Sequence, residues 1–224
     1  TDTAGAVMEV ALPTGAVEVS TSLEDALDPW AVMALAHGAG AGMDHPFLLG
    51  LAAACARQGV SVMRFAFPYA QAGRKMPGPA SHAIATWTAV EATARQAVAG
   101  VPFVAAGKSY GGRMASMAAA GGAIAPAALV YLGYPLHPPG APEKLRADHL
   151  PQITVAQLFV EGTNDPFIQP RAQYDQAVSG CRDASTVWID GGTHSFEVKG
   201  RRRPADQIGA ELADLIVPWL RQRF

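Results

Sequence analysis

A Gly-x-Ser-x-Gly pattern over residues 107–111 contains the residue types best suited to covalent chemistry. A short apolar run precedes the pattern, and small residues typical of a helix follow it. A strand that turns directly into a helix strains its turn residue and lifts the Ser109 side chain above the sheet. Gly107 and Gly111 remove β-carbons that would clash in such a turn. Backbone N–H groups at the helix start could stabilise an oxyanion, so this context predicts a nucleophile elbow.

The same residues allow two other interpretations. The pentapeptide alone is short enough to be an ordinary tight turn. Gly107-Lys108-Ser109 also resembles the end of a phosphate-binding loop, whose pattern needs another glycine five positions earlier. Pro102 stands at that position, which argues against phosphate binding. The interpretation of Ser109 as a nucleophile therefore depends on partners elsewhere in the chain.

His194 and Asp165 are the candidate partners of this serine, because a serine hydroxyl needs a general base at neutral pH. His194 lies in a Gly-rich loop after the last predicted strand, and Asp165 lies in a turn after an earlier one. The stretches from Ser109 to Asp165 and from Asp165 to His194 are each long enough for about one or two strand–helix units, so the three side chains could converge. Asp165 would then orient His194 and stabilise its imidazolium form. Alternatively, Asp165 could begin a turn or cap a helix, and His194 could be an exposed loop residue. Asp190 is a rival acid close to His194 on the same loop.

A glycine-rich stretch over residues 37–42 follows an apolar run and suits an oxyanion hole. One N–H would come from Tyr110, the residue after the candidate nucleophile, and a second from Ala39 in this stretch. The competing interpretation is a dinucleotide fingerprint, but its third glycine position holds Met43. Arg64, at the end of the next predicted strand, could suit a 2′-phosphate. Because the chain has no Tyr-x-x-x-Lys pair and the fingerprint is incomplete, we expect no cofactor.

These candidate residues stand at the ends of predicted strands. Strands alternate with helices along the chain, which predicts an α/β fold with a mostly parallel sheet and helices on both faces. In such sheets the functional side chains gather at the carboxyl ends of the strands. Strands are expected at residues 7–12, 16–20, 30–36, 60–67, 101–106, 127–132, 155–161 and 185–189, the first two as an antiparallel hairpin, and helices at 46–58, 81–98, after 109, at 170–179 and at 204–221. No linker divides the chain, so we expect a single domain over residues 1–224.

The composition is that of a globular protein in a reducing compartment. Half of the 224 residues are hydrophobic, which is enough for a sizeable core. The net charge of -2 gives no basic excess for nucleic acid. No apolar run reaches the ~18 residues of a membrane span, no signal peptide is visible at Thr1, and Cys55 and Cys181 are too few for a disulfide framework. We therefore expect a cytoplasmic protein that binds neither nucleic acid nor membrane.

Asp44 and His45 form an adjacent pair that could suggest a metal site. Two ligands without a third are weak evidence for a metal. Asp44 precedes a predicted helix, and a helix cap is the favoured interpretation of this residue. We therefore expect no metal site.

Along nearly its whole length the chain resembles the α/β-hydrolase superfamily. It is similar in particular to a small group of bacterial hydrolases related to the Tex-type and KANL-type eukaryotic proteins, and more distantly to dienelactone hydrolases. The stretches that carry this resemblance are residues 36–47, 64–69, 107–113, 133–137 and 191–196. The resemblance implies a hydrolase fold, a Ser109–Asp165–His194 triad and neither metal nor organic cofactor. It implies no substrate, because dienelactone hydrolases use Cys where this chain has Ser109.

The expected substrate is a small carboxylic ester or thioester, cleaved through an acyl-enzyme on Ser109. The connection over residues 133–154 is short and Pro-rich, too short for a large lid, so an open or shallow site is predicted. The candidate substrate contacts, each of which could instead be an ordinary core or surface residue, are Lys108, Tyr69, Tyr134 and Phe167. Some eukaryotic members of the group are subunits of chromatin complexes, so the alternative is a non-catalytic interaction protein that keeps the hydrolase fold. The intact triad favours an enzyme.

Overall fold

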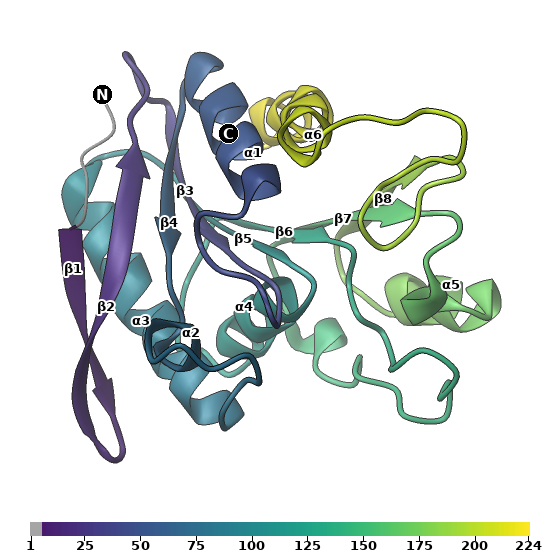
Figure 1. Cartoon of the computed structure of the whole chain (residues 1–224), viewed down its shortest axis with the longest axis horizontal. Coiled ribbons are helices and arrows are strands. Elements are labelled where there is room, and N and C mark those ends of the chain that lie inside the picture. The colour runs from purple at the N-terminus through teal and green to yellow at the C-terminus, as the bar shows by residue number, and fades with distance from the viewer. Residues whose placement is uncertain (1–5) are drawn as a thin grey trace.

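Eight strands form one sheet within residues 6–224, the part of the chain that the computed structural model describes (Figure 1). The strand order is β1-β2-β4-β3-β5-β6-β7-β8. The strands are β1 (Ala6–Leu12), β2 (Gly15–Glu24), β3 (Ala31–Ala36), β4 (Val60–Phe65), β5 (Phe103–Lys108), β6 (Ala128–Leu132), β7 (Ala156–Gly162) and β8 (Ala184–Ile189). The start of the domain expected over residues 1–224, including Thr1, lies outside the described residues.

The sheet is parallel except at its N-terminal edge. β1 pairs with β2 and β2 with β4 in antiparallel fashion, whereas every later pairing is parallel. The turn of the hairpin ends at Gly15, whose φ of 120° is readily available only to glycine. The predicted mostly parallel sheet with an N-terminal antiparallel hairpin is therefore confirmed, although β2 extends to Glu24 and so reaches β4.

The central strands are mostly apolar because both faces of the sheet are covered. Every residue of β3, β4 and β6 is buried. β8 lies at the edge with β7 as its neighbour, and its residues are all half-buried. The continuous apolar runs in the sequence thus correspond to the middle of the sheet.

Helices cover both faces of the sheet (Figure 1). The helices are α1 (Pro46–Arg57), α2 (Pro68–Gln71), α3 (Ala80–Ala97), α4 (Tyr110–Ala120), α5 (Arg171–Ser179) and α6 (Ala205–Arg221), with the 3-10 helices η1 (Leu150–Gln152) and η2 (Pro166–Ile168). α1 and α6 share the core on one face, and α3, α4 and α5 contribute to the core on the other. Two separate hydrophobic cores therefore hold the sheet in place, as the predicted arrangement requires.

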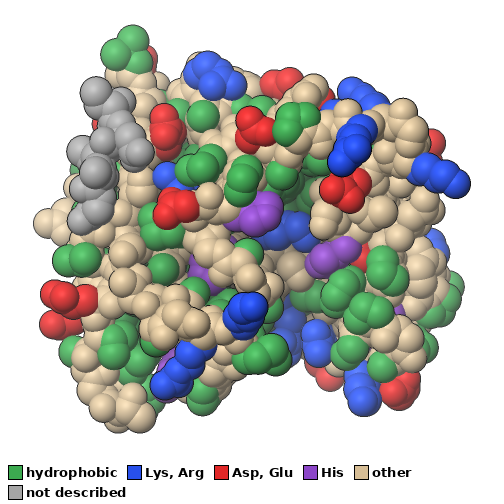
Figure 2. All heavy atoms as spheres, viewed as in Figure 1, with side chains coloured by type: hydrophobic (Ala, Val, Ile, Leu, Met, Phe, Trp, Pro, Cys, Tyr) green, Lys and Arg blue, Asp and Glu red, His purple; other side chains and the backbone are tan. Residues whose placement is uncertain are grey.

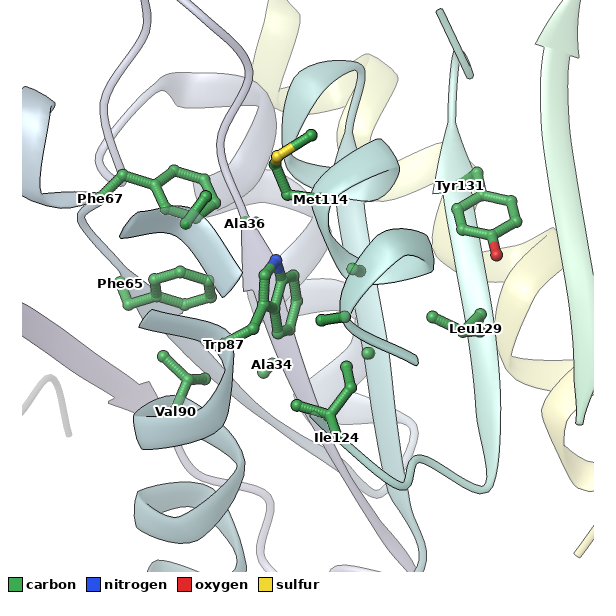
Figure 3. Close-up of a cluster of buried hydrophobic side chains, with 14 of the residues drawn as sticks. Ala34, Ala36, Phe65, Phe67, Trp87, Val90, Met114, Ile124, Leu129 and Tyr131 are labelled. Atoms are coloured by element: carbon green, nitrogen blue, oxygen red, sulfur yellow. The ribbon is translucent and has the colours of Figure 1, made fainter. Parts of the chain in front are cut away.

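Trp87 of α3 packs deep in the larger core (Figure 3). Its ring meets that of Phe65 on β4 edge to face, with ring centroids 5.1 Å apart. Such edge-to-face pairs add about 0.5–1.5 kcal/mol beyond the burial of the rings. This contact joins α3 to the strand that is followed by α2.

Three local expectations differ from the structure. The segment between the strand expected over residues 60–67 and the helix expected over residues 81–98 contains the short helix α2, because Pro68 at its first position is already set for helical φ. α3 begins at Ala80 after Pro79, one residue before the expected start at residue 81. His45, not Asp44, caps α1, with its Nδ1 accepting a hydrogen bond from the Phe47 N–H. Asp44 instead pairs at 2.7 Å with the buried Arg64, whose charge needs a partner.

The connection between β6 and β7 contains no lid domain. Within it lies the single-turn helix η1, and the remainder is irregular. The expectation of no large lid is therefore confirmed. None of the helices in residues 6–224 is both long enough and apolar enough to cross a membrane.

Candidate active site

Ser109 occupies the sharp turn between β5 and α4. Its φ of 48° and ψ of -114° lie in a region that non-glycine residues rarely adopt, and such a conformation costs of order 1–3 kcal/mol. Glycines make the turn possible: a β-carbon at Gly107 would overlap the backbone of Gly112, and one at Gly111 would lie 2.6 Å from the His37 carbonyl oxygen. The β5–α4 junction thus has the geometry of a nucleophile elbow.

His194 links Ser109 to Asp165 through hydrogen bonds. Its Nε2 lies 2.9 Å from the Ser109 Oγ, and its Nδ1 lies 2.6 Å from the Asp165 Oδ2. These contacts fit a tautomer in which Nδ1–H donates to the carboxylate and Nε2 accepts from the serine hydroxyl. The fully buried Asp165 follows β7, and His194 follows β8, so the carboxyl ends of three parallel strands meet here.

Asp165 makes the contacts that both of its interpretations require. Its Oδ1 accepts a hydrogen bond of 2.8 Å from the Phe167 N–H and caps η2, while its Oδ2 is left for His194. The cap fixes the carboxylate in the orientation that His194 needs. Asp190, the rival acid, is exposed on the loop that leads to His194.

Phe167 stacks on the ring of His194, with centroids 4.1 Å apart and an angle of 27° between the planes. Because the Phe167 N–H is bonded to Asp165, one short segment both orients the imidazole and covers its face. The ring of His194 is therefore held on one edge by a carboxylate and on one face by an aromatic ring.

Lys108 places a positive charge beside His194. Gly133, with a φ of 69°, leaves room for both side chains: a β-carbon there would lie 3.1 Å from the Lys108 Nζ and 3.3 Å from the His194 Nδ1. Burial lowers the pKa of Lys108 to about 8, opposed by the negative charges of Asp165 and Glu161. Burial of the imidazole lowers the pKa of His194, and the charge of Lys108 lowers it further, against the hydrogen bond to Asp165. His194 is thus kept in the neutral form that can accept a proton.

The loop after β3 is held by His37 and Tyr69. The His37 Nδ1 lies 2.9 Å from the Gly38 carbonyl oxygen, and the Tyr69 hydroxyl donates to the same oxygen at 3.5 Å. The His37 Nε2 accepts from the Phe67 N–H, so Nδ1 carries the proton. In a trans peptide the N–H points away from the carbonyl. The Ala39 N–H therefore points away from the buried His37 and Tyr69, and Ala39 lines the same cavity as Ser109.

A cavity of about 720 Å³ opens above Ser109. Figure 2 shows a hollow near the centre of one face in which Lys, Arg and His side chains gather among apolar ones. Its apolar walls include Phe47, Leu48, Phe167 and Ile208. Tyr110, the other expected oxyanion donor, also lines it, and Lys108 and Phe167 are the two expected substrate contacts that do so.

Tyr69 and Tyr134 do not line the cavity, which corrects their expected substrate contact. Tyr69 is buried with its hydroxyl bonded to the Gly38 carbonyl. Tyr134 is 1% exposed, and its hydroxyl donates to the Arg146 carbonyl oxygen at 2.8 Å. Both rings pack among other aromatic side chains.

Arg113 and Arg146 line the cavity but were not among the expected contacts. Arg113 lies four residues after Ser109 on α4, so helical periodicity could have placed the two on neighbouring positions of one face. Arg146 belongs to the irregular β6–β7 connection, whose sequence has no periodicity from which its position could be inferred.

The residues considered for a metal or a nucleotide are used elsewhere. Within residues 6–224, no three His, Cys, Asp or Glu side chains are grouped so that they could hold a metal ion. Arg64 is buried and donates to the Asp44 carboxylate, the Met43 carbonyl and the Ser22 hydroxyl. Its guanidinium is therefore engaged in the protein interior and not presented to a phosphate.

Comparison with known proteins matches residues 29–219 to a family model described as an alpha/beta hydrolase domain. A serine hydrolase without a lid from Xanthomonas campestris is 18% identical, with a TM-score of 0.72 over 97% of this chain and 95% of that chain. A dienelactone hydrolase from Anabaena variabilis is 19% identical, with a TM-score of 0.68 over 98% of each chain. Est1E from Butyrivibrio proteoclasticus, solved with ferulic acid bound, is 15% identical, with a TM-score of 0.72 over 95% of this chain and 99% of that chain. At these identities the three structures are similar in fold.

Proposed function

Because the chain belongs to the alpha/beta hydrolase family, we propose that it is a serine hydrolase that cleaves a carboxylic ester or thioester through an acyl-enzyme on Ser109. The observation that carries the proposal is the chain of contacts from Ser109 through His194 to Asp165 at the elbow. A hydroxyl, a neutral imidazole and a buried carboxylate in this order are the groups that nucleophilic acyl transfer requires.

In the acylation step, the Ser109 Oγ attacks the carbonyl carbon of the substrate while His194 Nε2 takes the hydroxyl proton. The resulting tetrahedral intermediate carries an oxyanion, for which the Ala39 and Tyr110 N–H groups are the proposed donors. The intermediate collapses as His194 returns the proton to the leaving alkoxide or thiolate. Asp165 stabilises the transient imidazolium and does not itself take the proton.

In the deacylation step, a water molecule attacks the acyl-enzyme and gives one proton to His194. Collapse of the second tetrahedral intermediate returns this proton to the Ser109 Oγ and releases a carboxylic acid. The net reaction adds one water across the ester bond, and the enzyme is regenerated without a cofactor.

The cavity supports a small substrate. Its volume of about 720 Å³ lies in the range of small-molecule sites, which is about 300–1,000 Å³. Phe47, Leu48 and Ile208 offer apolar contacts to the carbon skeleton, and Lys108 remains a proposed contact for a polar or anionic group.

Fluorophosphonate labelling tests the proposal directly. Such a probe reacts with an activated serine hydroxyl, so we expect wild-type protein to be labelled and Ser109→Ala to lose labelling. Ser179→Ala, at an exposed serine of α5, serves as the matched control and should label like wild type. Circular dichroism would verify that every sample is folded. A folded wild-type protein without labelling would contradict the proposal and favour a non-catalytic role for the fold.

A further inference from the structure

The charges that line the cavity are mostly positive, although the whole chain has a net charge of -2. The cavity is lined by the cations Lys108, Arg113 and Arg146 and by one carboxylate, that of Glu197. Neither guanidinium of the two arginines has an ion-pair or hydrogen-bond partner among residues 6–224, and the Arg113 Nε is buried without an acceptor. Guanidinium groups left unpaired beside an apolar cavity are placed to bind a ligand.

The polar groups packed near Arg113 are neutral and supply no counter-charge. Tyr134 and Ser116 both lie close to His149, with the Ser116 Oγ 2.7 Å from the His149 Nε2. Burial and the charge of Arg113 lower the pKa of His149 to about 4, opposed by the charge of Asp148, so this ring is uncharged at neutral pH. None of these three side chains therefore balances the guanidinium of Arg113.

Arg113 and Arg146 are close enough for their charges to repel. Burial lowers the pKa of Arg113, and the charge of Arg146 lowers it further. Two like charges held together without a carboxylate destabilise the empty site, and a bound anion would remove that repulsion. The pair is thus better suited to a liganded state than to the empty one.

The backbone holds both arginines in place. The Arg146 N–H donates to the Leu136 carbonyl at 2.8 Å, and its carbonyl accepts from the Tyr134 hydroxyl at 2.8 Å. The Arg113 N–H donates to the Ser109 carbonyl at 3.1 Å and so fixes Arg113 one turn beyond the nucleophile. Four residues of helix rise about 6 Å, which places the guanidinium of Arg113 within reach of a substituent on an ester bound at Ser109.

We propose that Arg113 and Arg146 form an anion-binding subsite, distinct from the oxyanion hole, that recognises a carboxylate or phosphate group carried by the substrate ester. The subsite rests on the proposed function, because it positions the ester bond at Ser109. Guanidinium forks match planar carboxylates and phosphates through paired hydrogen bonds, which gives the site both affinity and orientation. The substrate class is therefore an anionic ester or thioester and not a neutral one.

Matched pairs of anionic and neutral esters test the subsite. The pairs are para-acetoxybenzoate with its methyl ester, mono(para-nitrophenyl) adipate with its methyl ester, and para-acetoxyphenyl phosphate with its dimethyl ester. Together they place a carboxylate on the alcohol side, a carboxylate on the acyl side, and a phosphate. For wild type, we expect kcat/KM to favour the anionic member of at least one pair by about tenfold or more, a preference that falls as salt is added.

Substitutions assign that preference to the two arginines. Arg113→Gln and Arg146→Gln should each reduce the anionic-to-neutral ratio of kcat/KM by about fivefold or more. Arg182→Gln, at an exposed arginine outside this cavity, should leave the ratio unchanged. Hydrolysis of the neutral esters with no anionic preference, or a preference insensitive to both substitutions, would overturn the subsite while the proposed function stands. Turnover of no ester, together with absent fluorophosphonate labelling, would overturn both.

Discussion

Single side chains in this site serve two contacts at once. Asp165 caps η2 with one carboxylate oxygen and binds His194 with the other, so its local and its catalytic interpretations are compatible. His37 likewise donates to one backbone carbonyl and accepts from a backbone N–H, which fixes the loop of Ala39. For both Asp165 and His37, one hydrogen bond of the side chain therefore fixes its orientation for the other.

Lys108 should influence the acid limb of the pH–activity profile. Its charge lowers the pKa of His194, and its own pKa of about 8 keeps it charged over that limb. Removing the charge in Lys108→Met therefore raises the pKa of His194. Because only neutral His194 accepts the serine proton, the acid limb of kcat/KM should move to higher pH.

The measurement is kcat/KM for a neutral ester from pH 5 to pH 9. Lys108→Arg retains a charge at this position and should keep the limb closer to that of wild type. Lys199→Met, at an exposed lysine, should not move it. An acid limb that stays in place or moves to lower pH in Lys108→Met would contradict the assigned influence of Lys108.

At the scale of elements, the helix pair α1 and α6 supports one wall of the cavity. Phe47 and Leu48 lie in the first turn of α1, Ile208 lies in the first turns of α6, and all three line the cavity. The two helices pack closely because glycines face the opposite backbone, with Gly50 against the Asp206 carbonyl and Gly209 against the Phe47 carbonyl. The packing of two helices thereby sets the position of residues that line the cavity.

Gly209→Ala should destabilise the protein through this helix contact. A β-carbon at Gly209 would overlap the Phe47 carbonyl oxygen and approach the Leu51 nitrogen to 3.0 Å. Overpacking typically costs about 1–3 kcal/mol. Alanine is a better helix former than glycine by about 1 kcal/mol, so a net loss of stability in Gly209→Ala would identify packing as the cause.

Urea denaturation measures the effect of Gly209→Ala as a lower transition midpoint. Gly42→Ala is the matched control, since a β-carbon there would meet nothing within 4 Å and its φ is not positive. It should shift the free energy of unfolding by less than about 0.5 kcal/mol. A midpoint for Gly209→Ala equal to or above that of wild type would contradict the close packing of α1 on α6.

At the scale of the whole molecule, the candidate site lies at the carboxyl-terminal edge of the sheet. The β6–β7 connection does not cover this site. Ser109, Asp165 and His194 follow the carboxyl ends of β5, β7 and β8, as expected for a parallel sheet. The connection that holds Arg146 contributes to the wall of the cavity without forming a lid domain. Under the proposed function, the cavity itself would limit the size of the substrate.

Acyl-chain preference should reflect this limit. We expect kcat/KM on para-nitrophenyl esters to be highest for short acyl chains and roughly tenfold or more lower for laurate, because a long chain exceeds the apolar contact that the cavity offers. The series runs from acetate to laurate below the aggregation concentration of each ester. A preference for laurate over butyrate would contradict a site built for small substrates.

Much of the fold could be predicted from the sequence because its signals are local. Buried strands are continuous apolar runs, and helices follow them with prolines and glycines at their ends, so the alternation implies a parallel sheet. Gly107 and Gly111 mark the elbow because only residues without a β-carbon fit between the strand and the helix. The short β6–β7 connection likewise excludes a large lid by length alone.

The tertiary structure decided which side chains meet. The sequence left Asp165 and Asp190 as rival acids, and the fold brings Asp165 to His194 because β7 and β8 are neighbours in the sheet. In the fold, Tyr134 is buried in the core. Arg146, in the irregular β6–β7 connection, lines the same cavity as Arg113. These outcomes depend on the packing of segments distant in sequence, and hydrophobic periodicity carries no information about which distant side chains will be neighbours.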